Sequence, residues 1–142
     1  MSALGRPVPV PDAQSEPFWN AAATHVLMLA RCSRCREFSH PPDVICPRCG
    51  ATDPDFVFTP VNGAGTIRSW TVMRQSFLPG FDRDVPFVLV DVELSAQSDL
   101  RLIGRLLGGA DAALRLGVPV ELAFEDIGAG VSVPAWVLVE HD

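Results

Sequence analysis

Four cysteines in two closely spaced pairs constrain the fold of this chain more than any other feature. Cys32 and Cys35 form the first pair, and Cys46 and Cys49 form the second pair after ten intervening residues. A tetrahedral zinc ion needs four ligands, and two turns with a two-residue gap between their thiolates supply them. Gly50 follows the second pair, where the chain must turn sharply and glycine adopts a positive φ without steric cost. The spacing therefore predicts a two-knuckle ribbon around one metal ion.

The metal is expected to be structural zinc, because four thiolates leave no open coordination position for a substrate or a water. Two disulfides or a dithiol redox pair are one alternative. The shared spacing of the two pairs and the cytosolic character of the chain favour a metal over disulfides. An iron site of the rubredoxin type uses similar thiolates and is a second alternative, which a visible chromophore would reveal.

Size and charge narrow the class of protein. The chain has 142 residues, which suffice for one ordinary domain or two very small ones, and 48% of them are apolar. Its net charge of −6 argues against a sequence-independent nucleic-acid binder, which needs a basic surface to displace counterions. The same charge argues against docking on an anionic membrane. We therefore expect no nucleic-acid partner and no membrane partner.

The N-terminal segment shows no apolar core of the secretory type and is broken by Pro7, Pro9 and Pro11. The longest stretch without Asp, Glu, Lys or Arg covers residues 17–30, which is too short to span a bilayer. A soluble cytoplasmic protein is the resulting expectation.

The first quarter of the chain is expected to hold an arm and a short helix. Repeated prolines block helix and sheet pairing in residues 1–15, which predicts a flexible arm. Residues 16–25 are predicted to form a helix, because Ser15 precedes Pro17 in a cap-then-proline start. A helix this short is unstable alone, so it must pack against its own domain or against a partner.

The rest of the chain divides into a predicted zinc ribbon at 26–58 and a predicted barrel at 59–142. Five runs rich in β-branched and aromatic residues, each bounded by turn-forming residues, predict the strands of the barrel. They cover residues 65–77, 86–94, 100–107, 119–127 and 132–140, with a short helix expected over 111–116. This is the element order of a five-stranded Greek-key OB barrel. The predicted fold class is thus mainly β: an N-terminal helix, a rubredoxin-like zinc ribbon and an OB-fold barrel.

Together these features resemble the family called domain of unknown function 35, also described as acyl-CoA-associated zinc-ribbon OB-fold proteins. The resemblance runs from about residue 16 to the C-terminus. Besides the cysteines, it rests on residues 17–19, 41–42, 65–67, 69–72, 86–87, 117–120 and 124–126. One departure is Asp43, where relatives often carry a basic residue that could hold a phosphate or a partner.

The resemblance implies a role that spacing alone does not show. Such proteins accompany thiolase-fold enzymes, which include thiolases, acyltransferases and the lipid-transfer-type aldolases of steroid side-chain degradation. It therefore implies a non-catalytic subunit of a hetero-oligomer, which braces the enzyme and helps to form its passage for CoA or acyl-CoA. A stand-alone acyl-CoA-binding protein is one alternative. An OB-fold nucleic-acid binder that stacks bases on Trp70, Phe87 and Trp136 is another.

The sequence suggests two binding surfaces, a ligand groove and a partner interface, which we state as hypotheses. Arg68, Trp70 and Arg74 have i, i+2 and i+6 spacing and would share one face of the first barrel strand. They form either an ordinary exposed face or a groove in which the arginines meet CoA phosphates and the indole stacks on adenine. The predicted partner interface comprises exposed apolar patches around Phe18, Trp19 and Trp136.

No catalytic site is expected in the chain. It has no tyrosine, no Gly-rich phosphate loop and no Gly-x-Ser-x-Gly motif, and its four cysteines are committed to metal. The remaining acid–base candidates are His25, His40, His141, Glu121, Glu125 and Asp126. His40 has no visible partner, His141 is expected at a loose end, and His25 ends the predicted helix, where a positive charge suits the helix dipole. Acids at strand ends are more often solvated. We therefore predict that the chain is not an enzyme on its own.

Overall fold

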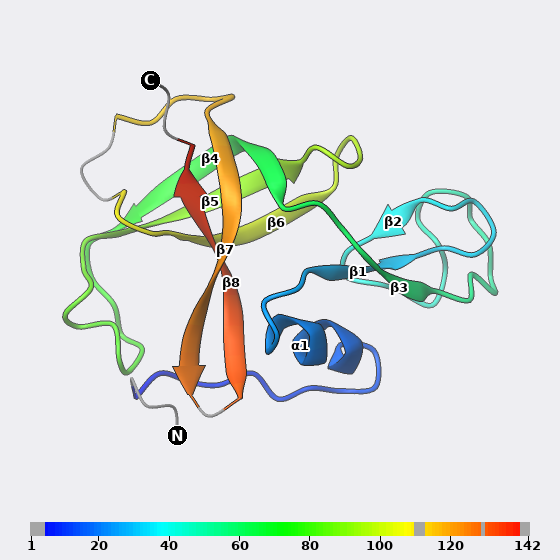
Figure 1. Ribbon diagram of the computed structural model, residues 1–142, viewed down its shortest axis with the longest axis horizontal. Coiled ribbons are helices and arrows are strands. Elements are labelled where there is room, and N and C mark those ends of the chain that lie inside the picture. The colour runs from blue at the N-terminus through cyan, green and yellow to red at the C-terminus, as the bar shows by residue number, and fades with distance from the viewer. Residues whose placement is uncertain (1–4, 110–112, 129, 140–142) are drawn as a thin grey trace.

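The computed structural model describes residues 5–109, 113–128 and 130–139 of the chain. Figure 1 shows a barrel, a smaller sheet beside it, and a short helix near both. The elements of the described residues are α1 (Glu16–Ala22), β1 (Met28–Arg31), β2 (Phe38–Ser39), β3 (Val57–Pro60), β4 (Ala64–Met73), β5 (Phe87–Leu94), β6 (Arg101–Leu106), β7 (Pro119–Gly128) and β8 (Val131–Leu138). No helix in the described part of the chain has the length and apolar character needed to cross a bilayer.

The five later strands close into a barrel in the order β4-β5-β6-β8-β7, which confirms the predicted five-stranded barrel. Alternation sets the inner face of β5, where Val88, Val90 and Val92 are buried while the residues between them are half-buried. Trp136 of β8 lies in the same core with no exposed surface. Gly104 of β6 leaves room for this indole, because a Cβ there would lie 3.1 Å from the indole Cδ1.

The smaller sheet has the order β2-β1-β3 and carries the cysteine turns at its outer end. Its central strand β1 pairs antiparallel with both neighbours, and Leu29 and Ala30 in that strand have no exposed surface. The amide of Val61, just after β3, donates to the carbonyl of Leu27, so the chain leaves this sheet directly toward the barrel. A sheet of this size has little core of its own, which is why a metal or a neighbouring element must stabilise it.

Helix α1 packs against β8 of the barrel and β1 of the small sheet (Figure 1). Phe18 on its inner face is buried, and Pro17 occupies its first turn as predicted. The Ser15 side chain does not cap the helix. Instead, its hydroxyl accepts a hydrogen bond from the amide of Asp12, and the Asp12 carboxylate accepts one from the amide of Ser15.

The short helix predicted over residues 111–116 is absent from 113–116, the part of that segment that the structure describes. Residues 111 and 112 lie outside the described residues. The reason lies in the chain that follows, because the Gly117 amide donates to the Ile67 carbonyl and the Val118 carbonyl accepts from the Ile67 amide. A helix of about one turn does not outweigh these hydrogen bonds to β4.

Within the predicted flexible arm, Arg6 is anchored on the barrel, whereas residues 7, 8 and 10–14 are exposed. Arg6 is only 6% exposed. Its Nε donates to the carbonyl of Gly80 at 3.1 Å, and its guanidinium pairs with the carboxylates of Asp84 and Glu125. These partners are more than 70 residues away in sequence, so local composition does not reveal them.

Candidate metal centre and ligand surfaces

The two cysteine turns have the same backbone construction. In the first, the amide of Arg36 donates to the carbonyl of Cys32 at 2.9 Å, and in the second the amide of Gly50 donates to the carbonyl of Cys46 at 2.8 Å. Each donor follows the second cysteine of its pair and has a positive φ, 68° at Arg36 and 75° at Gly50. The sharp turn predicted at Gly50 is therefore present, and the first knuckle makes the same turn with an arginine.

The four cysteine sulfurs converge on one point. All of them lie within 4.8 Å of one another, with 3.9 Å between the sulfurs of Cys32 and Cys49 and 3.8 Å between those of Cys35 and Cys46. Four sulfurs bound at about 2.3 Å to a tetrahedral zinc lie about 3.8 Å apart, so the donor set fits that ion. The amide of Arg34 points at the Cys32 sulfur at 3.3 Å, as expected for a thiolate ligand.

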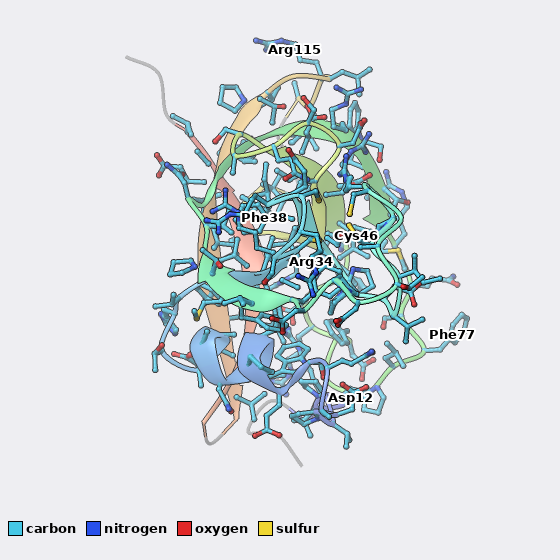
Figure 2. The ribbon with its side chains drawn as sticks, turned by 90° about the vertical axis from the view of Figure 1, so that its right-hand side faces the viewer. Asp12, Arg34, Phe38, Cys46, Phe77 and Arg115 are labelled. Carbon is cyan, nitrogen blue, oxygen red and sulfur yellow. The ribbon has the colours of Figure 1, made fainter. Side chains whose placement is uncertain are left out.

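The environment of the sulfurs differs from one side of the cluster to the other. Cys32 and Cys46, the second of which is labelled in Figure 2, are fully buried, whereas Cys49 is exposed. Burial raises the pKa of the Cys46 thiol, but hydrogen bonds from the Cys49 and Arg48 amides and from the neighbouring sulfhydryls outweigh it. The resulting pKa is about 7. At Cys35 the effect is opposite: a hydrogen bond from the Glu37 amide lowers the thiol pKa, but burial and the neighbouring sulfhydryls raise it to about 12. A bound metal ion is therefore needed to hold all four sulfurs as thiolates.

The paired knuckles allow a matched test of backbone strain. Arg36→Gly should stabilise the protein by up to about 1 kcal/mol, because glycine adopts the positive φ without steric cost. Gly50→Ala should destabilise it by about 1 kcal/mol for the converse reason. Thermal unfolding of the zinc-loaded protein measures both, and opposite signs are the expected result. Equal destabilisation by the two substitutions would contradict the shared turn geometry.

The predicted groove of Arg68, Trp70 and Arg74 is not assembled on one face. A bulge between Ile67 and Ser69 changes the alternation of β4, so Arg68 lies on the outer face, with its guanidinium 3.6 Å from the Glu93 carboxylate. Trp70 lies opposite Val90 on the other face and remains 39% exposed. Arg74 follows the end of β4 and is exposed. The three side chains therefore do not share a face as predicted.

Of the three aromatics predicted to meet a partner, only Trp19 retains accessible surface of any size. Trp136 is wholly inside the barrel, because β8 presents it to the core opposite Gly104, and Phe18 is buried under α1. The prediction that Trp136 forms an exposed patch is thus wrong. Trp19 packs edge-on against Phe18 and lines a shallow pocket of 280 Å3, which also includes Ile103 of β6, an exposed residue.

The acid–base candidates form structural contacts rather than a reactive group. Asp126 accepts hydrogen bonds from the His25 ring and the Ser132 hydroxyl, and these two bonds, the first of them foremost, hold its pKa below the usual value. The Ser132 hydroxyl and the His25 ring thus contact the same carboxylate oxygen, and each of the two hydrogen bonds ends on Asp126. Burial lowers the pKa of His40, whose ring stacks on Phe18.

Three acid–base candidates remain, namely Glu121, Glu125 and His141. Glu125 pairs with Arg105, and Glu121 is exposed on β7. His141 lies outside the described residues. Ser132 lies within hydrogen-bond reach of the Asp126 carboxylate, but the lowered pKa of that carboxylate makes it a weak base.

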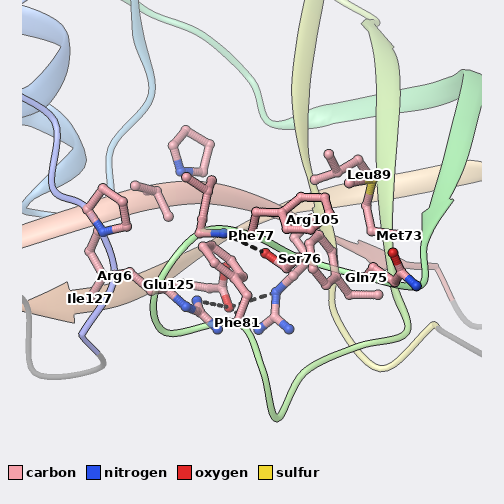
Figure 3. Close-up of a pocket in the computed structure, with 15 residues that line it drawn as sticks. Arg6, Met73, Gln75, Ser76, Phe77, Phe81, Leu89, Arg105, Glu125 and Ile127 are labelled. Atoms are coloured by element: carbon pink, nitrogen blue, oxygen red, sulfur yellow. Dashed lines mark hydrogen bonds and ion pairs between the residues drawn. The ribbon is translucent and has the colours of Figure 1, made fainter.

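A pocket that the sequence analysis missed lies on the outer face of the barrel, under the β4–β5 loop at residues 74–86. It has a volume of 480 Å3 and is lined by side chains from the N-terminal arm, this loop and five strands (Figure 3). The apolar run of residues 86–89 indicates a buried strand, but nothing in the sequence predicts that the arm and the loop lie over it.

A cysteine-bearing ribbon followed by a closed five-stranded barrel defines a zinc ribbon joined to an OB fold. Residues 19–55 match the family model of the rubredoxin-like zinc ribbon domain of ChsH2, and residues 58–125 match that of its C-terminal OB-fold domain. The chain therefore belongs to the ChsH2-type DUF35 family, as its motifs predicted.

Two known proteins are similar to the chain over most of its length. A protein of Thermomonospora curvata named "Probable enoyl-CoA hydratase alpha subunit" is 30% identical over 92% of this chain. The match covers 39% of the length of that relative. A chain in a solved structure described as an Ltp2-ChsH2(DUF35) aldolase is 28% identical, with a TM-score of 0.78 over 92% of this chain and 98% of that one.

Proposed function

We propose that this chain is a non-catalytic subunit that binds and stabilises a thiolase-like enzyme acting on acyl-CoA, an aldolase in the first instance. The observation that carries the proposal is the structural similarity to a chain of the Ltp2-ChsH2(DUF35) aldolase, which covers nearly the whole of both chains. The low pKa of Asp126, the carboxylate that Ser132 contacts, makes this pair a poor catalytic group, which supports a subunit whose partner performs the chemistry. A thiolase or an acyltransferase is the alternative partner, and steroid side-chain degradation is the proposed setting.

We further propose that Cys32, Cys35, Cys46 and Cys49 bind one structural zinc ion, which holds residues 26–58 together as a ribbon. The support is the convergence of four sulfurs at the spacing that zinc requires. Bound zinc would supply no chemistry in the reaction, because four thiolates close its coordination sphere. The ribbon would then present residues 59–142, the OB fold, at a fixed position beside α1.

The partner interface in this proposal includes Trp19 and the exposed Ile103 beside it. An aromatic side chain next to a shallow apolar pocket is the composition that anchors protein interfaces. Trp70 and Arg74 are the residues proposed to face the CoA passage of the assembled enzyme, since Arg68 already faces Glu93. A stand-alone acyl-CoA-binding role rests on the same two side chains.

The nucleic-acid alternative loses two of its three proposed stacking platforms. Phe87 is 8% exposed and Trp136 has no exposed surface, so neither can stack on a base without opening the barrel. The net charge of −6 also opposes binding to phosphates. The cytoplasmic location inferred from the sequence stays a prediction.

Affinity purification of the tagged chain from its native host tests the proposal. A thiolase-fold protein should co-purify in a stable stoichiometric complex. Ile103→Asp, at a residue of the same surface that is 65% exposed, should reduce its recovery at least tenfold while leaving the melting temperature of the isolated chain nearly unchanged. Val44→Asp, which changes an exposed residue of the ribbon, is the matched control and should recover the partner fully. Turnover of an acyl-CoA thioester by the isolated chain would contradict the accessory role.

A further inference from the structure

The pocket under the β4–β5 loop, called the outer pocket below, has the size and lining of a small-molecule site. Its volume of 480 Å3 falls in the range of about 300–1,000 Å3 typical of ligand pockets. Its walls are mainly apolar side chains, which come from both barrel strands and the loop. They include Met73, Phe81, Phe87, Leu89, Ile127 and Val133. The barrel core is complete without this space, because the inward side chains of β5 are already buried on the other face.

The charged groups at the outer pocket balance one another. Arg6, Asp84, Arg105 and Glu125, called the charge network below, contribute two positive and two negative charges. Glu125 lies between the two guanidiniums, as Figure 3 shows, and accepts hydrogen bonds from Nε and NH2 of Arg105. A ligand therefore meets polar groups that are already neutralised, so the pocket attracts neither an anion nor a cation strongly.

The same network fixes the walls before any ligand arrives. The Arg6 guanidinium lies 4.3 Å over the Phe81 ring and its Nε donates to the Gly80 carbonyl, so the arm and the loop are tied together. Phe81 in turn packs against Phe87 on the barrel, with 5.4 Å between ring centroids. Because the walls of the pocket are already ordered, a ligand that binds there loses less conformational entropy.

We propose that the outer pocket binds an uncharged small molecule, or the uncharged part of one, with a compact hydrocarbon body of about 15–20 non-hydrogen atoms. The apolar walls select the hydrocarbon, and the charge network disfavours a charged group because its two positive and two negative charges, all on described residues, cancel one another. The position is consistent with the general use of the OB barrel, which binds ligands on the face of its second and third strands beside the first loop. Every residue in the argument belongs to this chain, so the inference does not depend on the proposed partner.

Titration with N-phenyl-1-naphthylamine, an uncharged fluorescent probe, tests this inference on the isolated zinc-loaded chain. The expected result is saturable fluorescence enhancement with one site per chain. Leu89→Trp and Met73→Trp each add volume to a half-buried wall of the pocket without replacing a residue of the charge network, and each should weaken probe binding at least tenfold. Ile103→Trp is the matched control, since it adds the same ring to the outer face of β6 outside the pocket, and it should leave probe binding unchanged.

Competition separates the proposed ligand class from a charged one. Decanol should displace the probe at least as well as decanoate does. Displacement by decanoate at tenfold lower concentration would overturn the assignment to uncharged ligands. Absence of saturable binding to the wild-type chain, or full binding to both tryptophan variants when their melting temperatures show them to be folded, would overturn the site itself.

Discussion

Cys46→Ser should unfold the zinc ribbon and release the metal. Cys46 is fully buried and its sulfur is 3.8 Å from that of Cys35, so a serine hydroxyl in its place leaves the ion with three thiolates. Structural zinc contributes on the order of 10 kcal/mol to segments of this kind, which is as much as the whole stability of many domains. Loss of bound zinc and a large fall in melting temperature, measured on the same preparation, are the expected results.

The control for this experiment is Val44→Ser, which introduces the same residue at an exposed position two residues earlier. It should keep both the zinc and the melting temperature of the wild type. The barrel strands pair with one another independently of the ribbon sheet, so part of the β-sheet circular dichroism should survive in Cys46→Ser. A Cys46→Ser protein with unchanged zinc content and stability would show that the four sulfurs do not hold the ion.

Trp136→Ala should destabilise the barrel by about 3–5 kcal/mol, the range for truncation of a large buried aromatic. The indole has no exposed surface and fills the space that Gly104 leaves on the neighbouring strand. Its side chain also lies opposite Leu122 on β7, so the cavity would open between three strands. Urea unfolding followed by circular dichroism measures the change in free energy of unfolding.

A second variant, Trp136→Phe, separates the effect of lost volume from the effect of a lost hydrogen bond. The indole Nε1 finds no hydrogen-bond acceptor among the described residues, so phenylalanine loses volume but no hydrogen bond, at a cost of about 1–2 kcal/mol. Equal destabilisation by alanine and phenylalanine would indicate that Nε1 makes a hydrogen bond that the structure does not show. A change below about 1 kcal/mol for alanine would contradict the burial of Trp136.

The parts of the fold that were predictable are those encoded by local spacing. The two-residue gaps of the cysteine pairs and Gly50 specify the second knuckle within five residues of chain, and the structure repeats that geometry in the first knuckle. Strand β5 was equally predictable, because a run of valine and other strand-forming residues at 86–94 is bounded by turn-forming residues in the sequence. Both signals depend on residues that are close together in the sequence, so the amino-acid sequence alone is enough to predict these two elements.

The errors arose where one residue changes the alternation or where distant segments meet. An inserted residue in β4 at Arg68 places this arginine and Trp70 on opposite faces, and no turn residue marks the bulge. Trp136 lies in a run that alternates poorly, so its direction could not be read from sequence. The outer pocket depends on Arg6 reaching Asp84 and Glu125, a contact set only by the closed barrel.

The central claim is that a thiolate-bound ion holds the small sheet that positions the barrel for a larger enzyme. The most direct test is the metal content of freshly purified, reduced wild-type protein, measured by inductively coupled plasma mass spectrometry. The account predicts one zinc per chain in a colourless sample. Protein that is folded but contains no metal, or that contains iron with a visible chromophore, would contradict it.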